Sequence, residues 1–340
     1  MPALRRELSQ FEIREYLLIT KFSWLMLASF ATISLVACFT SNFIFAPTLI
    51  PSNLIVAFLA LAVFVIYLKF RNDFFITAIS NAVATAALFC TVLPLFTYVA
   101  THYSRSFGLW DSRLASIDAS FYLDWPSFLN WTDTHPVIAR VLSYAYGSYV
   151  PEAAVMIIFL SIIGEYCRLQ MALFAFQISV AICTVVSIFM PALGQHAYRN
   201  IDTAFTYRWL TPIPSDVVKQ LRTDMPVIPL DNLQGIITFP SCHAVLGVLL
   251  LWAFWKNPVV RWIALVVNGA LVLATPIFGG HYFVDIAAGA FVAAGSILIA
   301  RVMVKLAQPY VQDSRTRTYA ATNINQVYGC VGAGKTPLEV

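Results

Sequence analysis

The chain has 340 residues, of which 59% are hydrophobic and 11% charged, and its formal net charge is +4. Soluble domains carry about 25% charged residues, so the composition excludes an ordinary water-soluble enzyme, and the chain is too apolar to be disordered. The small net charge gives no indication of nucleic-acid binding, and the mean hydropathy of +0.75 instead predicts an all-α polytopic membrane protein.

Eight apolar segments approach the length of about 20 residues that a membrane-spanning helix needs. In chain order they cover residues 22–39, 54–68, 75–100, 149–163, 171–193, 243–255, 259–278 and 284–304. The fourth and sixth segments are the shortest. The sequence therefore predicts about eight transmembrane helices.

The distribution of basic residues predicts the orientation of these spans. With the N-terminus in the cytoplasm, 14 of the 21 Lys and Arg residues fall on the cytoplasmic side and the other 7 on the opposite side. Cytoplasmic loops of membrane proteins are enriched in Lys and Arg. We therefore expect a multi-pass protein of the cell membrane with both termini in the cytoplasm.

Two long segments between the spans are predicted to be extracytoplasmic. Residues 101–145 contain three Trp and resemble an amphipathic stretch that lies on the membrane surface. Residues 194–239 form a long polar loop, and long loops are often functional.

The C-terminal tail contains a glycine-rich string that matches a nucleotide-binding pattern. The string GCVGAGKT, residues 329–336, satisfies the phosphate-loop consensus G-x-x-x-x-G-K-[ST]. That loop binds phosphate only between a strand and a helix, whereas here Pro337 follows at once. We therefore interpret the tail as a flexible segment and expect no nucleotide partner.

Chemistry-bearing residues gather in two strings at predicted helix starts on the outer face. FPSCHAVLG contains Ser241 and His243, and FGGHYFVDIAAG contains His281 and Asp285. His281 and Asp285 are four residues apart, so they share one helix face, and the carboxylate can fix the tautomer of the imidazole. The span at 259–278 joins the two strings as a hairpin, which can bring both histidines to one membrane interface.

Two histidines, one of them backed by a carboxylate, suit phosphoryl transfer. One imidazole can attack phosphorus while the other protonates the leaving oxygen. Two alternatives remain open at this level, because the same three groups could hold a metal ion or form structural hydrogen bonds. Phosphoryl oxygens also need cations, and the polar loop supplies Arg199, Arg208, Lys219 and Arg222.

The two strings resemble the second and third signature motifs of the type 2 phosphatidic acid phosphatase superfamily. The resemblance covers roughly residues 75–305 and implies that His281 is the nucleophile, Asp285 its orienting group, His243 the general acid and Ser241 a phosphate contact. It also implies that no metal or other cofactor is needed.

This sequence departs from the family motifs at several positions. Cys242 replaces the usual Gly, Ala274 and Thr275 replace a Ser-Arg pair, and the first motif is not recognisable where MPALGQHAYRN stands. These departures resemble the inositol phosphorylceramide synthase branch, an inositolphosphotransferase-like group. His196, within that last string, is a weaker candidate for substrate contact.

The resemblance implies a six-helix lipid phosphatase or phosphotransferase core at residues 73–305. Residues 1–72 would add a cytoplasmic N-terminus and two accessory transmembrane helices, and residues 306–340 a cytoplasmic tail. The expected substrate is a lipid phosphate, lipid diphosphate or phospholipid in the bilayer, with an alcohol as a possible acceptor. The active site would be extracytoplasmic. The alternative is a non-catalytic transporter or scaffold that retains the fold.

Overall fold

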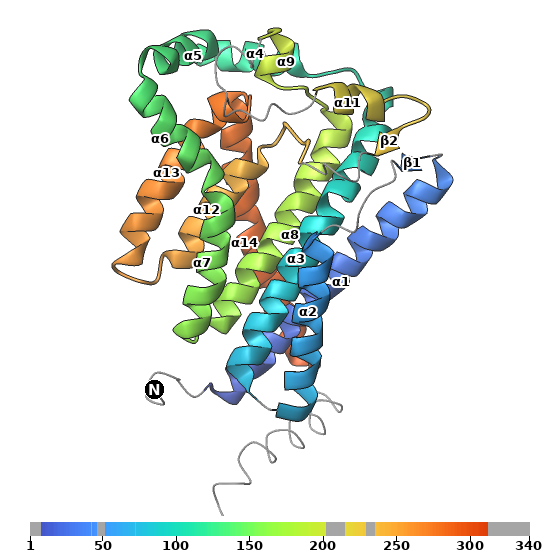
Figure 1. Ribbon diagram of the computed structural model, residues 1–340, viewed down its shortest axis with the longest axis vertical. Coiled ribbons are helices and arrows are strands. Elements are labelled where there is room, and N and C mark those ends of the chain that lie inside the picture. The colour runs from blue at the N-terminus through green and yellow to red at the C-terminus, as the bar shows by residue number, and fades with distance from the viewer. Residues whose placement is uncertain are drawn as a thin grey trace, which may run out of the picture.

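A computed structural model describes residues 8–41, 43–45, 52–71, 73–201, 215–228 and 235–311 (Figure 1). These residues are overwhelmingly helical. The long helices are α1 (Gln10–Thr40), α2 (Ser52–Ile66, continued by a π-helical turn at Tyr67–Arg71), α3 (Phe74–Tyr103), α8 (Tyr166–Phe189), α13 (Val260–Phe278) and α14 (Phe283–Val311). The shorter elements are a 3₁₀ turn (Ser104–Ser106), α4 (Asp111–Ser120), α5 (Trp125–Thr134), α6 (Pro136–Gly147), α7 (Tyr149–Ile162), α9 (Gln195–Tyr198), α11 (Ser215–Leu221) and α12 (Cys242–Phe254).

The predicted all-α polytopic membrane class is confirmed. Six of the described helices are long and apolar enough to cross a membrane, namely α1, α2 with its extension, α3, α8, α13 and α14. The two shortest predicted spans are not single helices of full membrane-spanning length. The fourth, α7, forms with α6 a pair bent by 49°, and the sixth, α12, is an apolar helix of 13 residues. Each of the eight predicted segments thus contains an apolar helix.

The helices bury two large apolar clusters inside the bundle. One cluster joins α1, α8, α12 and α14 and includes Ile19, Phe174, Leu249 and Ala300. The other joins α3, α7, α8, α12 and α13 around residues such as Leu160. α8 and α12 contribute to both clusters and are therefore the central elements of the fold.

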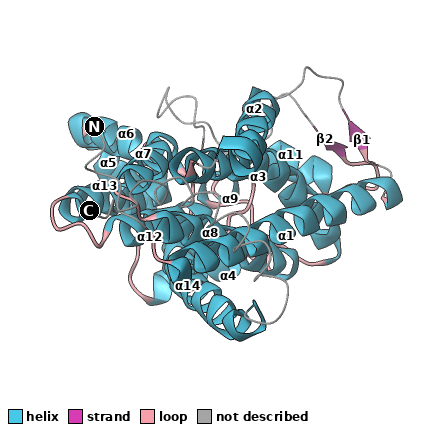
Figure 2. Ribbon diagram, turned by 90° about the horizontal axis from the view of Figure 1, so that it is seen from below, coloured by secondary structure: helices cyan, strands magenta, loops and turns pink. Residues whose placement is uncertain are grey.

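The first two helices differ in how they join the bundle. α1 begins with a capping box, in which Ser9 and Glu12 each accept from the other's backbone N–H, and its Leu18 and Ile19 belong to the central cluster. α2 packs mainly on α3 and lies at the rim when the bundle is seen along its length (Figure 2). The boundary at residue 72 between accessory helices and core stays a prediction.

Short helices close one end of the bundle. α4, α5 and α9 lie across the top of the long helices in Figure 1, and they come from the two segments predicted to be extracytoplasmic. Trp125 at the start of α5 is 1% exposed and donates from Nε1 to the carbonyl oxygen of Pro276 in α13 at 2.8 Å. This buried hydrogen bond attaches the surface helices to the bundle.

Two very short strands are also present among the described residues. β1 (Ile44–Phe45) and β2 (Val227–Ile228) pair in parallel, with Ile44 opposite Val227. They connect the loop after α1 to the loop after α11. The pair lies beside the short helices at the same end of the bundle (Figure 1).

Candidate active site

The first histidine string forms the beginning of α12. Ser241 is the N-cap residue, and its Oγ accepts from the backbone N–H of Ala244 at 3.3 Å. A Ser at this position satisfies a helix N–H that would otherwise lack a partner. The backbone N–H of Ser241 also donates to the carbonyl oxygen of Asp285 at 3.1 Å. The local sequence thus caps α12 and at the same time attaches it to α14.

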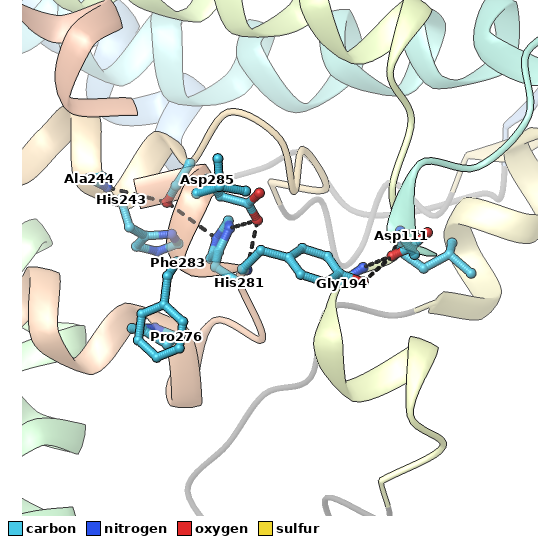
Figure 3. A network of polar contacts seen from close by, with 12 residues as sticks. Asp111, Gly194, His243, Ala244, Pro276, His281, Phe283 and Asp285 are labelled. Atoms are coloured by element: carbon cyan, nitrogen blue, oxygen red, sulfur yellow. Dashed lines mark hydrogen bonds and ion pairs between the residues drawn. The ribbon is translucent and has the colours of Figure 1, made fainter. Parts of the chain in front are cut away.

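The second string closes the site with His281 held between two partners (Figure 3). Its Nδ1 lies 3.3 Å from Oδ2 of Asp285, and its Nε2 lies 3.4 Å from Oγ of Ser241. All three side chains are at most 1% exposed. A carboxylate beside Nδ1 favours the tautomer with hydrogen on Nδ1, which leaves the Nε2 lone pair directed toward Ser241.

His243 faces the same space from the first turn of α12. Its ring centroid is 6.0 Å from that of His281. Tyr146 stacks on the His243 ring at 4.5 Å, with its hydroxyl 3.4 Å from Nδ1, and Tyr149 meets the ring edge-on at 5.3 Å. The two tyrosines at the α6–α7 bend therefore position His243, and one of its ring nitrogens remains without a described partner.

The turn before His281 depends on glycine. Gly280 has a φ of +62°, and a Cβ atom there would lie 2.8 Å from Nδ1 of His196. Its carbonyl oxygen accepts from the backbone N–H of Gln195 at 2.6 Å, and Gly194 opposite has a φ of +92°. Only glycine adopts such backbone angles without strain and leaves room for the two loops to come this close. His196, the weaker candidate, therefore lies against residues 279–282, the loop between α13 and α14 that carries His281 and that we call the histidine loop.

Two aspartates of α4 hold the histidine loop through hydrogen bonds. The sequence motifs did not identify these two residues. Asp111 accepts from the hydroxyl of Tyr282 at 2.9 Å and from the backbone N–H of Gly194 at 2.9 Å. Asp118 accepts from the first two N–H groups of α14, Phe283 and Val284, each at 2.9 Å. Both carboxyl groups are at least 96% buried.

A weak signal for these aspartates exists in the sequence. Asp111 and Asp118 are seven residues apart, so they share one face of an α4 that otherwise places apolar side chains there, such as Leu114. A buried carboxylate is costly unless it is hydrogen-bonded. Two acidic residues on the buried face of an amphipathic helix therefore indicate partners elsewhere in the fold, but not which partners.

The three candidate phosphate-binding cations that the structure describes do not converge. Arg199 follows α9 and donates from Nε to Oε1 of Gln195 at 2.8 Å, so it lies next to the residue that contacts Gly280. Lys219 pairs with Asp216 on α11 at 3.7 Å. Arg222 donates to Ser104 and Phe107. Arg208 lies outside the described residues, as does the glycine-rich string at 329–336.

Burial governs the ionisation of the histidines in the loops. Burial lowers the pKa of His281 to about 4, although the backbone carbonyl of Thr238 acts in the opposite direction. Burial also lowers the pKa of His196 to about 4, with a smaller contribution from His281. Both imidazoles are therefore neutral near pH 7, and the contact between His281 and Asp285 is a hydrogen bond to a neutral ring.

The described part of the chain contains no cluster of three or more His, Cys, Asp or Glu side chains placed to hold a metal ion. The site brings together two imidazoles, a carboxylate and a hydroxyl. Such a set can carry out acid–base and nucleophilic chemistry.

Comparison with known families gives one match. Residues 112–299 match the family model described as the PAP2 superfamily. This range is more than half of the chain and contains Ser241, His243, His281 and Asp285. No curated protein and no solved structure matches the chain.

Proposed function

The chain belongs to the PAP2 superfamily, which supports a phosphatase-type function on lipids, and on this premise we propose that it cleaves a lipid phosphate ester through a phosphohistidine. The most direct support is the position of His281, whose ring lies between Asp285 and Ser241 and 6.0 Å from the ring of His243. These are the four residues that the sequence motifs select.

In the first step, the Nε2 lone pair of His281 attacks phosphorus. A P–N bond forms, the P–O bond to the lipid alcohol breaks, and His243 gives its proton to the leaving oxygen. Asp285 stabilises the positive charge that develops on the ring of His281. Ser241 can turn its hydroxyl hydrogen from Nε2 toward a phosphoryl oxygen, because its lone pair already accepts from Ala244.

In the second step, an oxygen nucleophile attacks the phosphohistidine. His243 removes the proton of the incoming hydroxyl, a P–O bond forms and the P–N bond breaks, which restores neutral His281. Water as the nucleophile makes the enzyme a phosphatase. A lipid alcohol makes it a phosphotransferase, the outcome that the resemblance to the inositolphosphotransferase-like branch favours.

Neutralisation of the phosphoryl group requires positive charge near His281. Arg199 is the best placed of the described candidates, because its partner Gln195 also contacts Gly280. The N-terminus of α12 lies at the site, and helix N-termini favour the binding of anions. Lys219 and Arg222 remain candidates only if substrate binding brings them closer, and Arg208 remains a candidate outside the described residues.

The location of the site fits a substrate in the bilayer. The histidines lie at the end of the bundle covered by α4, α5 and α9, next to helices with exposed apolar side chains such as Val137 and Val141 on α6. An apolar helix at the membrane interface can admit a lipid whose headgroup stays in the polar layer. We place this end on the extracytoplasmic side, because the basic loops lie at the opposite end.

A product assay distinguishes the two outcomes and tests the proposal. Purified full-length protein is incubated with phosphatidic acid, prenyl diphosphate and phosphatidylinositol, with and without alcohol acceptors. Free phosphate from phosphatidic acid or prenyl diphosphate, or inositol phosphate from phosphatidylinositol, indicates hydrolysis. A new phosphate ester of the added alcohol indicates transfer. No product from any substrate, together with no phosphoenzyme, would favour the non-catalytic transporter or scaffold.

Cysteine labelling tests the sidedness. In a background without native cysteines, Asp133→Cys on α5 should react with an impermeant maleimide in intact cells. Pro258→Cys, in the turn between α12 and α13, should react only after lysis. The reverse pattern would place the histidines on the cytoplasmic side.

A further inference from the structure

A pocket lies at the end of the bundle opposite the histidines. It has a volume of about 320 Å³ and is lined by the first turns of α1, the loop before α8, the end of α12 and Arg301 of α14. At 1.5 Å per residue, Arg301 is about 24 Å along α14 from Asp285. The pocket is therefore separate from the candidate active site.

The pocket has a basic part built on one indole ring. The guanidinium carbon of Arg168 lies 4.3 Å from the centroid of Trp252, and that of Arg301 lies 5.4 Å from it. Arg168 is fixed, because it donates to the carbonyl oxygens of Trp252 and Ala253 at the end of α12. Arg301 has no ion pair among the described residues, so one guanidinium group remains available to an anion.

The same pocket has an acidic part on α1 and in the loop before α8. Glu12, Glu15 and Glu165 all line it. Glu165 is paired with Lys256 at 2.9 Å, and Glu12 completes the capping box with Ser9. Glu15 has no ion pair or hydrogen bond in the described part of the chain. The pocket thus offers one available cation and one available carboxylate.

This charge pattern selects the class of ligand. A simple anion would meet Arg301 and Arg168, but the two lining carboxylates that are not ion-paired with Lys256 would repel it. A molecule with a phosphate and an ammonium group satisfies both parts at once. Exposed apolar residues adjoin Arg301 on α14, with Leu298 63% and Val302 44% exposed, and they can contact acyl chains.

We propose that this pocket binds the headgroup of a zwitterionic phospholipid, with the phosphate at Arg301 and Arg168 and the ammonium group toward Glu15. The site is distinct from the histidine centre. Because it adjoins the ends of α1, α8, α12 and α14, an occupied pocket would hold these four helices together. Its ligand would therefore act as a structural lipid rather than as a substrate.

Native mass spectrometry of the purified full-length protein tests the assignment. Delipidated protein is titrated with phosphatidylethanolamine, phosphatidylcholine or phosphatidylglycerol, and the occupancy of one bound lipid is recorded. The wild type should retain the zwitterionic lipids at least fivefold more than phosphatidylglycerol. Arg301→Gln should reduce that retention at least fivefold, and Glu15→Gln should reduce the preference over phosphatidylglycerol.

Arg261→Gln is the matched control, because Arg261 also lies over a Trp, at 5.2 Å from the ring centroid of Trp262, but does not line the pocket. It should bind lipid as the wild type does. Equal losses in Arg261→Gln and Arg301→Gln, or equal binding of phosphatidylglycerol, would overturn the proposal. Displacement of the lipid by an equal concentration of free phosphoethanolamine would show that the pocket takes a soluble zwitterion instead.

Discussion

The hydroxyl oxygen of Tyr282 lies 2.9 Å from Oδ1 of Asp111, although the two residues are 171 positions apart. The same carboxylate accepts from the backbone N–H groups of Leu193 and Gly194. Asp111 thus connects α4, the loop before α9 and the residue next to His281. The position of the candidate nucleophile is therefore set by a helix outside both histidine strings.

This connection predicts a measurable coupling. Tyr282→Phe and Asp111→Asn should each lower kcat by roughly tenfold, because an unsatisfied buried polar group costs about 1–3 kcal/mol and loosens the loop. The double variant should lose little more than Asp111→Asn alone, because both substitutions act on the hydrogen bond between Tyr282 and Asp111. Tyr144→Phe, at an exposed tyrosine on α6, is the control and should retain activity. Fully additive losses would mean that the two side chains act independently.

His281 and Asp285 should fail in different ways when replaced. His281→Ala should abolish turnover and any acid-labile phosphoenzyme, because the attacking nitrogen is gone. Asp285→Asn should leave residual activity, since a misoriented imidazole still attacks occasionally, and the comparable change in serine proteases costs about 10⁴-fold. Both are followed with radiolabelled substrate and acid quench. His135→Ala, at an exposed histidine beside Trp131, should behave as the wild type, and a phosphoenzyme in His281→Ala would refute the assignment.

The role of His243 is tested through the leaving group. His243→Ala should lower kcat by roughly 10²–10⁴-fold on a lipid phosphate, the usual range for a general acid. The loss should shrink on a nitrophenyl phosphate, whose leaving oxygen needs no proton. Equal losses on both substrates would exclude the general-acid role. In the wild type, a phosphoenzyme trapped on His243 would mean that the roles of His243 and His281 are exchanged.

Gly280 should tolerate no side chain. Gly280→Ala places a Cβ at a φ of +62° and 2.8 Å from Nδ1 of His196, so the turn before His281 must shift. We expect a loss of kcat of at least 10-fold without loss of the folded protein, which gel filtration in detergent checks. Gly108→Ala is the matched control, since no atom lies within 4 Å of its added Cβ. Equal activity of the two variants would show that the turn geometry is not required.

The pH dependence of phosphoenzyme formation should follow the lowered pKa of His281. Only the neutral ring attacks, and burial lowers its pKa to about 4, so the rate should be constant down to about pH 5 and fall as the pH drops through about 4. An ordinary histidine would lose activity near pH 6.5. The measurement uses nitrophenyl phosphate and His243→Ala, which removes the contribution of the general acid. An acid limb that disappears in His196→Gln would assign the titration to His196, whose pKa is also about 4.

The helices could be predicted from the sequence because membrane burial is a local property. About 20 consecutive apolar residues suffice to define a spanning helix, and six of the eight predicted segments coincide with a described helix long and apolar enough to cross a membrane. The histidine strings were found for a similar reason. One hairpin, α12 to α14, joins them, so their approach needs only the packing of sequential helices.

The surroundings of the site were decided by tertiary structure alone. Asp111 and Asp118 contact residues 165 or more positions away, and Gly194 lies against Gly280 from a separate loop. The residue pattern within a single segment does not predict such pairs, because the packing of α4 and α9 on the bundle determines which residues meet. The four loop cations likewise carry no periodic signal, and only packing separates Arg199, beside the turn, from Lys219 and Arg222 on or next to α11. The sequence by itself thus determined the membrane helices and the reacting side chains, whereas the fold decided what holds those side chains in place.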